Sequence, residues 1–477
     1  MSLTTEAWSY ASLEDLLIHV IGGDWGKDES FIADDYKTVS CIRGSEFKNW
    51  KRDQGSTAVN RRIKTSSLNN RELRNGDVLI EISGGGPDQP VGRTVLITSL
   101  VLEQLEYPAV CTNFLRMARP SQEVSSTYLN YYLTKFYLSG EVVRYQGGSN
   151  NLRNLKFKDY SGIAIPIPLL AEQKIIAEKL DILLAQVETT KARLERIPEI
   201  LKTFRQSVLA AAVSGKLTEE WRGTISLVGW KNVKLDQIVE KIEAGKSLKC
   251  IETPPQKNEF GIIKISAVTW GSYDEEQSKT LPNKAHFLES RRIAVGDFLI
   301  SRANTIELLG NPVIVHAVTR NLMLSDKVLR LVMNEENKSW VSMFLRSKRG
   351  RKEIESRSTG NQMSMRNIGQ KALLDINLPK PQLEEQTEIV RRVEELFAFA
   401  DSIEQKTNAA LERVNNLTQS ILAKAFRGEL TADWRAENPD LISGENSAEA
   451  LLAKIKAERE KLALEKKAAN KTRKKKA

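Results

Sequence analysis

The feature that most constrains the fold of this chain is a long internal repeat. The segment 147–222 aligns without a gap to 360–435, at a constant offset of 213 positions. Each copy contains an Arg-Asn pair, a Pro-x-Pro element and a Glu-Gln pair, and each ends with the phrase Gly-x-Leu-Thr-x-x-Trp-Arg. Because chance does not hold such a register over 76 positions, the chain consists of two related halves.

Upstream of each copy the two halves match only weakly. The offset drifts there to 220 between the Gly-Asp pairs at 76–77 and 296–297, and to 222 between Trp8 and Trp230. Each half thus has a divergent front of about 160 residues, the size of one domain, and a closely matching back. Short apolar strands such as 78–82, separated by Gly, Asp and Asn, predict mixed α/β fronts that share a scaffold and differ in their loops.

The backs predict long helices. Apolar residues recur at alternating steps of four and three over four heptads, which is typical of a coiled-coil seam. The other copy offers a partner of the same length and period, so we expect the two helices to form an antiparallel coiled coil. Each helix should end at a C′ glycine, and Pro198 should bend the first helix without a long loop. The expected seam residues are Ile176, Leu180, Leu183, Val187, Leu194, Ile389, Val393, Leu396, Ile403 and Val414.

Composition excludes several classes of protein. The chain has 477 residues, of which 41% are hydrophobic and 28% charged, as in multidomain globular proteins. Its three cysteines and three histidines are scattered singly, so we expect neither a metal site nor a disulfide framework. Without a long apolar run or an export signal, the expected location is the cytoplasm, away from membranes. The net charge of +10 favours a polyanionic partner.

Motifs for catalysis are missing from the sequence. An amino-methylating enzyme would need an Asn- or Asp-Pro-Pro-aromatic motif, but Thr253 precedes the Pro-Pro pair and Gln256 follows it. A phosphate-binding loop would need a glycine where Glu240 stands, six positions before Lys246. Three isolated histidines support no catalytic triad. We therefore predict a chain that is not itself an enzyme.

Two variable α/β domains, each followed by a near copy of one long helix, form a pattern that resembles the specificity subunit of type I restriction-modification enzymes. The segments 166–181, 416–431 and 436–447 look like the type IA, or K-type, group. The resemblance covers the full length and implies two target-recognition domains that each read half of a split, asymmetric DNA sequence, with the helices as a ruler. The implied parts are target-recognition domain 1 at 1–168, helical spacer region 1 at 169–222, target-recognition domain 2 at 223–381, helical spacer region 2 at 382–435, and a basic, flexible C-terminal tail at 436–477 that contains one helical stretch at 448–467.

The resemblance also implies partners. In such systems two modification subunits bind S-adenosylmethionine and methylate adenine, and two restriction subunits use ATP and Mg²⁺ to translocate and cleave DNA. No cofactor would then belong to this chain. Two alternatives remain open: a self-sufficient methyltransferase or restriction enzyme, which would need the missing motifs, and a coiled-coil scaffold without a DNA function, which would not need two divergent basic fronts.

A surface that reads DNA should combine Lys and Arg for phosphates with Ser, Asn and Gln for base edges. Such residues gather just before each long helix and just after the two Gly-Asp strands. The candidate DNA-binding residues are Arg43, Lys48, Arg61, Arg62, Ser83, Arg144, Gln146, Ser149, Asn150, Arg153, Arg302, Asn304, Arg346, Lys348, Arg349, Arg351, Arg357, Asn361, Gln362 and Arg366.

Overall fold

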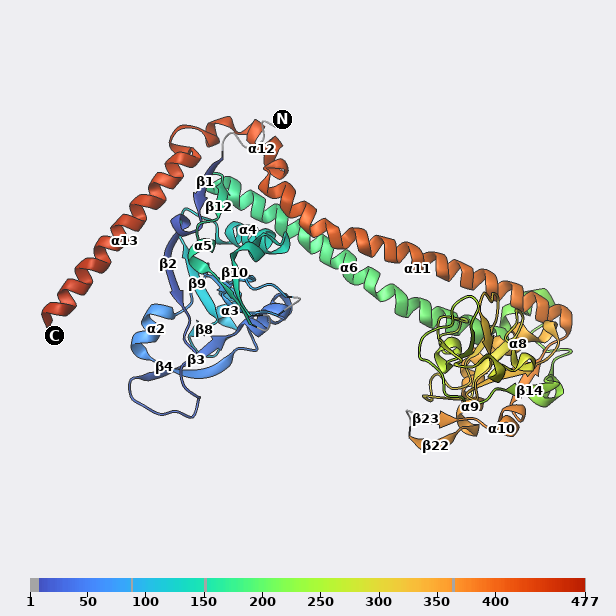
Figure 1. Cartoon of the computed structure of the whole chain (residues 1–477). Coiled ribbons are helices and arrows are strands. Elements are labelled where there is room, and N and C mark those ends of the chain that lie inside the picture. Colours follow the sequence, from blue (N-terminus) through green and yellow to red (C-terminus); the bar gives the residue numbers. More distant parts are fainter. Residues whose placement is uncertain (1–7, 87–88, 150–151, 363–364, 477) are drawn as a thin grey trace. The chain divides into compact units, whose positions relative to one another are not determined.

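The chain folds into two compact units, each built from one front and parts of both long helices (Figure 1). The structure is a computed structural model that describes residues 8–86, 89–149, 152–362 and 365–476. Unit 1 comprises the chain up to Arg193 and again from Leu411, and unit 2 is Leu194–Ala410. We call the part of unit 1 that precedes the first long helix front 1, and the corresponding part of unit 2 front 2.

Front 1 is built on a four-stranded antiparallel sheet in the order β2-β9-β5-β7. A second sheet has the order β4-β3-β8, with β3 and β8 parallel. Helix α4 (Ser126–Leu138) buries Tyr128, Leu133 and Phe136 in the core. The strands are β2 (Leu17–Gly22), β3 (Tyr36–Ile42), β4 (Val59–Lys64), β5 (Val78–Glu81), β7 (Thr94–Leu96), β8 (Ala109–Cys111) and β9 (Leu115–Pro120).

Front 2 repeats this plan. Its four-stranded sheet has the order β14-β21-β17-β19, and its three-stranded sheet, β16-β15-β20, again contains one parallel pair, β15 with β20. Helix α8 (Glu335–Arg346) takes the place of α4. The strands are β14 (Lys241–Ala244), β15 (Phe260–Ile263), β16 (Ser278–Thr280), β17 (Phe298–Ser301), β19 (Pro312–Ile314), β20 (Asn321–Met323) and β21 (Val328–Val332). The expected shared scaffold is confirmed.

Smaller elements complete each front. A two-stranded sheet leads into each long helix: β1 (Ser9–Ser12) with β12 (Ala164–Ile167), and β13 (Lys231–Lys234) with β24 (Asn377–Lys380). Each front also carries a small three-stranded sheet, described below. The short helices are α1 (Trp50–Asp53), α2 (Thr65–Arg71), α3 (Ser99–Glu103), α5 (Phe157–Tyr160), α7 (Glu219–Arg222), α9 (Lys348–Arg357), α10 (Gln370–Leu374) and α12 (Ala432–Glu437).

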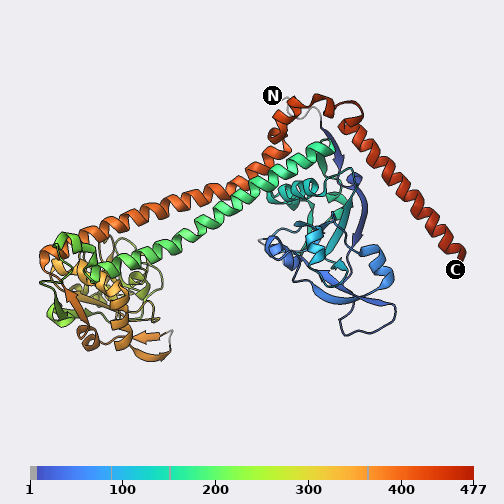
Figure 2. The same ribbon diagram turned by 180° about the vertical axis from the view of Figure 1, so that it is seen from behind.

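The two long helices are α6 (Leu170–Val213) and α11 (Leu383–Phe426), of 44 residues each. In unit 1 the start of α6 packs on the end of α11, where Leu180 shares an apolar core with Leu422 and Phe426. In unit 2 the end of α6 packs on the start of α11, through Val208, Leu209, Ala212, Val213, Ile389 and Val393. The start of one helix therefore lies beside the end of the other in both units, which confirms the antiparallel pair (Figures 1 and 2).

The predicted details of these helices mostly hold. Helix α6 runs through Pro198 without a loop. Gly215 and Gly428, just past the two helix ends, have φ of +73° and +75°, the left-handed conformation expected at C′. Among the predicted seam residues, Ile176, Leu180, Val187, Ile389, Val393 and Val414 are buried, and Leu183, Leu194, Leu396 and Ile403 are half-buried.

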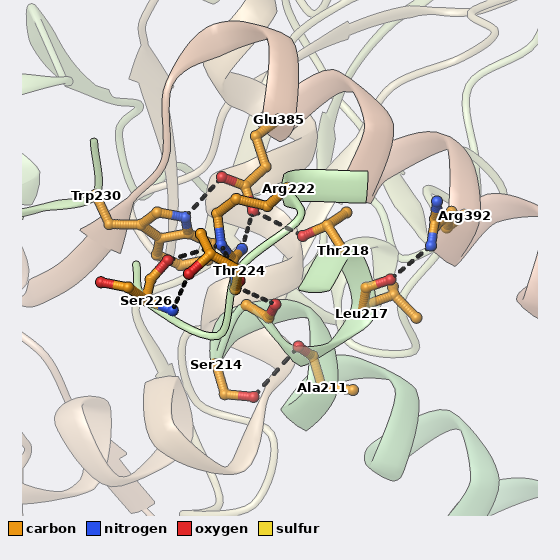
Figure 3. Close-up of polar contacts among 11 residues, drawn as sticks. Ala211, Ser214, Leu217, Thr218, Arg222, Thr224, Ser226, Trp230, Glu385 and Arg392 are labelled. Carbon is orange, nitrogen blue, oxygen red and sulfur yellow. Dashed lines mark hydrogen bonds and ion pairs between the residues drawn. The ribbon is translucent and has the colours of Figure 1, made fainter. Parts of the chain in front are cut away.

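A matched pair of polar clusters joins the ends of the helices, and we call them the helix-end clusters. In unit 2 the buried carboxylate of Glu385, in the first turn of α11, accepts hydrogen bonds from Thr218 Oγ1 at 2.7 Å and Trp230 Nε1 at 2.9 Å (Figure 3). The Arg222 guanidinium forms an ion pair with the same carboxylate. The end of α6 is thereby tied to the start of α11.

Unit 1 contains the same cluster built from equivalent residues. Glu172, in the first turn of α6, accepts hydrogen bonds from Thr431 Oγ1 at 2.6 Å and Trp8 Nε1 at 3.0 Å, and it pairs with Arg435. A carboxylate also suits the start of a helix, where the macrodipole favours negative charge. The repeated Glu-Gln pair and the repeated Thr-x-x-Trp-Arg phrase are thus two sides of one contact, which each helix makes with the other.

The C-terminal segment differs from the sequence prediction in the length of its helix, which was expected at 448–467. The structure has a longer helix, α13 (Ala448–Lys476). Its residues Ala448, Leu451 and Ile455 are buried, and the last two belong to the core of unit 1. These residues are spaced three and four apart, so they lie on one helix face that packs on the front. The Lys- and Ala-rich composition hid this short apolar stripe.

The structure also describes features related to membrane spans, metal sites and cysteines. No helix in the described ranges is long and apolar enough to cross a membrane. No three His, Cys, Asp or Glu side chains in those ranges are grouped so that they could hold a metal ion. Cys41, Cys111 and Cys250 are free thiols, and burial raises the pKa of Cys41 to about 12.

Candidate nucleic-acid interface

A β-hairpin and a two-residue strand form the small sheet of each front. In front 1, β10 (Gln146–Ser149) and β11 (Leu152–Leu155) form the hairpin, and β6 (Ser83–Gly84) pairs with β11. Arg153 lies opposite Gly84, and Asn154 lies opposite Ser83. The candidates Ser83, Gln146, Ser149 and Arg153 therefore come together on one sheet.

Front 2 has the equivalent sheet, with β22 (Thr359–Gln362), β23 (Met365–Asn367) and β18 (Ala303–Asn304). Here Arg366 lies opposite Asn304, and Asn367 lies opposite Ala303. The repeated Arg-Asn pair is therefore presented on both hairpins, next to Ser-Gly in one front and Ala-Asn in the other. The backbones of the candidates Asn361 and Gln362 lie in this sheet.

Backbone hydrogen bonds fix each small sheet to the rest of its front. In front 1 the Leu155 N–H donates to the Ile82 carbonyl at 2.9 Å. The Ile82 N–H in turn donates to the carbonyl of Phe114, also at 2.9 Å. Phe114 belongs to the loop between β8 and β9, so this loop borders the small sheet.

The same two bonds recur in front 2. The Ile368 N–H donates to the Arg302 carbonyl at 3.0 Å, and the Arg302 N–H donates to the Lys327 carbonyl at 2.8 Å. Lys327 lies in the loop between β20 and β21, the counterpart of the β8–β9 loop. Arg302 therefore stands where front 1 has Ile82, and Lys327 stands where it has Phe114. We call this shared arrangement the sheet-and-loop frame.

A hollow of about 650 Å³ adjoins the frame of front 1. Its wall contains the partly exposed aromatic rings of Trp25 (38%) and Phe114 (52%). The Arg93 guanidinium donates to the buried carboxylate of Glu81 at 2.9 Å, and this bond raises the pKa of Arg93. The remaining wall residues are Arg43, Gly44, Ser45, Ser83, Gly84, Gly85, Gln89, Thr112 and Asn113.

The corresponding region of front 2 has a different chemistry. Two smaller hollows, of about 390 and 360 Å³, share Asp326 and Lys327. One of them also contains the candidate Arg302 together with Asn367. The two fronts therefore surround the same frame with different side chains. The hollow of front 1 combines two aromatic rings with charged groups, whereas the hollows of front 2 have charged and polar groups and no aromatic ring among the described residues.

The other candidates of front 1 are spread over several elements. Arg43 pairs with Glu46 at 2.8 Å and borders the hollow. On β4, Arg61 stacks over the ring of Trp25 at 4.3 Å, and Arg62 donates to Thr38 Oγ1 at 3.0 Å.

The remaining candidates of front 1 differ in placement. Lys48 and Arg144 are exposed. Gln146 donates its side-chain amide to the carbonyl of Val91, and Asn150 lies outside the described residues.

In front 2 the structure divides the basic cluster into two groups. Arg346 donates to the carbonyls of Gly271 at 2.6 Å and Pro312 at 2.9 Å. Arg351 donates to two further carbonyls, and burial lowers the pKa of both guanidinium groups. These two arginines therefore hold loops of front 2 together.

The remaining basic candidates of front 2 differ in exposure. Lys348 and Arg349, at the start of α9, are exposed. Arg357 pairs with Glu353 at 3.0 Å, whereas Arg366 donates to Ser358 Oγ at 2.7 Å. Among the candidates between 346 and 357, Lys348 and Arg349 are therefore the ones whose charges face solvent.

Sequence reasoning missed the loop residues Phe114 and Lys327. A polar-to-aromatic break between two apolar runs, at 112–114, was the available signal in front 1. The stretch 325–327 was the equivalent signal in front 2. Neither stretch lies close in sequence to a hairpin, and only the folded chain brings each loop beside its small sheet.

Comparison with known proteins gives matches over nearly the whole chain. The family model described as "Type I restriction modification DNA specificity domain" matches residues 8–199 and 227–413. The chain is 38% identical over 464 residues to the type I restriction enzyme EcoKI specificity subunit of Escherichia coli K12, covering 95% of this chain and 96% of that one. It is 35% identical to the StySPI specificity subunit of Salmonella potsdam, with the same two coverages.

Solved structures share the fold. The HsdS subunit from Thermoanaerobacter tengcongensis matches 89% of this chain and 97% of its own length, with a TM-score of 0.57 and 18% identity. A chain from a study of complex assembly and conformational transition of the type I R-M system matches 90% of this chain and 100% of its own length. Its TM-score is 0.59 at 16% identity.

Proposed function

The chain belongs to the specificity subunits of type I restriction-modification enzymes, and from that membership we propose that its two fronts each read one half of a split, asymmetric DNA sequence. As a member of this family, it is a DNA sequence-recognition subunit and not itself an enzyme. Neither a self-sufficient restriction enzyme nor a scaffold without DNA function fits that assignment.

The observation that carries the proposal is the sheet-and-loop frame. Both fronts make the same two backbone hydrogen bonds, yet Ile82 and Phe114 in one become Arg302 and Lys327 in the other. Sequence is read by side chains at base edges, and position is set by the surrounding contacts. Two domains that read different half-sites need the same backbone frame with different side chains on it, which is the arrangement of the two fronts.

The proposed DNA contacts are exposed cations of each front and the Arg-Asn pairs of the two hairpins. Lys48 and Arg144 in front 1, and Arg302, Lys348 and Arg349 in front 2, would position the duplex through its phosphates. Arg153 and Arg366, each followed by Asn, lie on the hairpins, where Arg suits guanine and Asn suits adenine.

The partners follow from the resemblance. We propose that the chain works in the cytoplasm with two modification and two restriction subunits. The former would bind S-adenosylmethionine and methylate adenine, and the latter would use ATP and Mg²⁺ to translocate and cleave DNA. All of these cofactors would belong to the partners. The regions 169–222 and 382–435 would act as the spacer between target-recognition domains 1–168 and 223–381.

Exchange of one front tests the proposal. Residues 1–165 are replaced by the corresponding front of another family member, and the methylated sites in host DNA are mapped. One half-site should change and the other should stay the same. Exchange of residues 223–378 is the matched control and should change the opposite half-site. If either exchange altered both half-sites, the two fronts would not be separate readers.

A further inference from the structure

The residue whose carbonyl anchors the frame is chemically opposite in the two fronts. Phe114 contributes a large aromatic ring to the wall of the front 1 hollow and is 52% exposed. Lys327 occupies the same place in front 2, is exposed, and borders both hollows there. Each side chain starts from a backbone position fixed by the same hydrogen bond, so each is presented from an equivalent point.

The neighbours of Phe114 add groups that can meet a base. Asn113 precedes it in the same loop and is exposed, and Ser83 of the small sheet lines the same hollow. Thr112 Oγ1 is buried in that wall and has no hydrogen-bond partner among the described residues. An apolar ring beside unsatisfied and exposed polar groups matches the mixed edge of a base pair, with a methyl group next to hydrogen-bonding atoms.

The neighbours of Lys327 point to another base. Arg302, Asn367 and Asp326 share its second hollow, so two cations and an amide line one hollow together with a single carboxylate. In the major groove guanine presents two acceptors, O6 and N7, which Lys and Arg recognise. Thymine presents a methyl group, which an apolar side chain such as Phe contacts.

We propose that Phe114 and Lys327 are paired specificity-determining residues: Phe114 contacts the methyl group of a thymine in the half-site read by front 1, and Lys327 donates to O6 and N7 of a guanine in the half-site read by front 2. The inference rests on the proposed function. It goes beyond that function because it assigns one residue and one base type to each reader.

A reciprocal exchange of these residues is the test. The Phe114→Lys and Lys327→Phe chains are each assembled with their partner subunits, and each complex selects duplexes from a randomised library. Phe114→Lys should shift the preference at one position from thymine to guanine, in one half-site only. Lys327→Phe should shift guanine toward thymine in the other half-site. Each shift should be on the order of ten- to a hundredfold in relative preference.

Two control variants carry the same chemical changes elsewhere in the same fronts. Leu100→Lys alters a side chain of α3 that is 54% exposed and lies outside the hollow. Lys257→Phe alters an exposed lysine outside both hollows of front 2. Both controls should keep the selected sequences of the unaltered chain.

If both reciprocal variants selected the original sequence, or if one substitution changed both half-sites, the inference would be overturned. Should Phe114→Lys fail to assemble, Phe114→Ala takes its place and should lose the thymine preference without gaining another. Failure of the proposed function looks different, because the unaltered complex would then select no two-part sequence at all.

Discussion

The helix-end clusters are the same in both units, residue for residue, whereas the two sheet-and-loop frames share only their backbone bonds. Glu172 and Glu385 are each held by a Thr, an Arg and a Trp at equivalent positions. At the frames, Phe114 lines a hollow that also contains the ring of Trp25, whereas its counterpart Lys327 lines hollows without an aromatic ring among the described residues.

This difference separates two roles within the repeat: buried polar clusters hold the helices together, and exposed side chains meet a partner. A buried carboxylate tolerates few arrangements, because removal of any partner leaves a charge without compensation. A side chain that projects from a fixed backbone toward solvent can change without cost to the fold. The chain therefore has the same helix-end cluster in both units, whereas the side chains around its two sheet-and-loop frames differ.

The largest expected effect on stability comes from removing the central carboxylate of a helix-end cluster. Glu385→Ala leaves the Arg222 guanidinium, whose side chain is 7% exposed, buried without its counter-ion. We expect unit 2 to lose about 3–5 kcal/mol of stability, measured by denaturant unfolding of the full chain. Glu172→Ala should cost unit 1 a similar amount, because Arg435 is equally buried.

The control for this pair of variants is Glu199→Ala. It removes an exposed pair with Lys202, whose N···O distance is 4.0 Å, and should change stability by less than about 0.5 kcal/mol. Losses no larger than this control for both Glu172→Ala and Glu385→Ala would mean that the clusters do not hold the helices.

The basic cluster of front 2 contains both kinds of residue: an arginine that stabilises the fold, and exposed cations that can contact a partner. Arg346→Ala removes the hydrogen bonds to the carbonyls of Gly271 and Pro312 and should cost about 1–3 kcal/mol of stability. Lys348→Ala with Arg349→Ala should leave stability unchanged. In the assembled complex, however, this double variant should lower the logarithmic salt slope of DNA binding by about 0.9 for each phosphate that it no longer neutralises.

Calorimetry and a salt titration of DNA binding measure the two effects separately. An unchanged salt slope in the Lys348 and Arg349 variant would remove this surface from the DNA interface. A loss of stability in that variant would show that the division into buried and exposed cations is wrong.

Two glycines near the helix-end cluster of unit 2 should differ in how much stability is lost when each is replaced by alanine. Gly215 has φ of +73°, and a Cβ there would meet Leu227 Cδ2 at 2.4 Å. Gly223 has φ of +70° and open space around it. Gly223→Ala should cost about 1–2 kcal/mol from the left-handed backbone alone. Gly215→Ala should cost more in the same unfolding measurement, and equal losses would mean that the packing around Gly215 is loose.

The smallest expected change is in the spacing of the half-sites. Four residues are inserted into each long helix, after the exposed residues Ala192 and Gln405. Each insertion adds ~6 Å of helix, which corresponds to roughly one to two base pairs of duplex. It also adds ~40° of rotation, which is close to the roughly 34–36° of a single base pair, so we expect one base pair. Methylation mapping should show the same half-sites with one more base pair between them. An active enzyme with its original spacing would refute the idea of a helical ruler.

The sequence was informative wherever a pattern repeats. The constant offset of 213 and the seam that begins at Ile176 and Ile389 predicted two related fronts and a pair of antiparallel helices. The equivalent Arg-Asn pairs marked both hairpins. Periodicity carries this information because a helix or strand presents its faces at a fixed spacing.

Other features could not be predicted because they depend on contacts between distant segments. An arginine that faces solvent and one that binds carbonyls look alike in sequence, so Arg346 and Arg349 were grouped together. The position of Phe114 beside the small sheet depends on strand pairing across the whole front. The helix-end clusters needed two repeated phrases to be recognised as partners, although each was visible alone.

The discontinuous make-up of unit 1 has a consequence for the order in which the protein matures on the ribosome. Unit 2 is one continuous stretch, Leu194–Ala410, so its core is complete as soon as that stretch has emerged. The core of unit 1 includes Leu422, Phe426 and Ile455, which are synthesised only after the whole of unit 2. Front 1 is therefore made before unit 2 and must wait, with part of its apolar surface uncovered, until the end of α11 and the start of α13 have been synthesised.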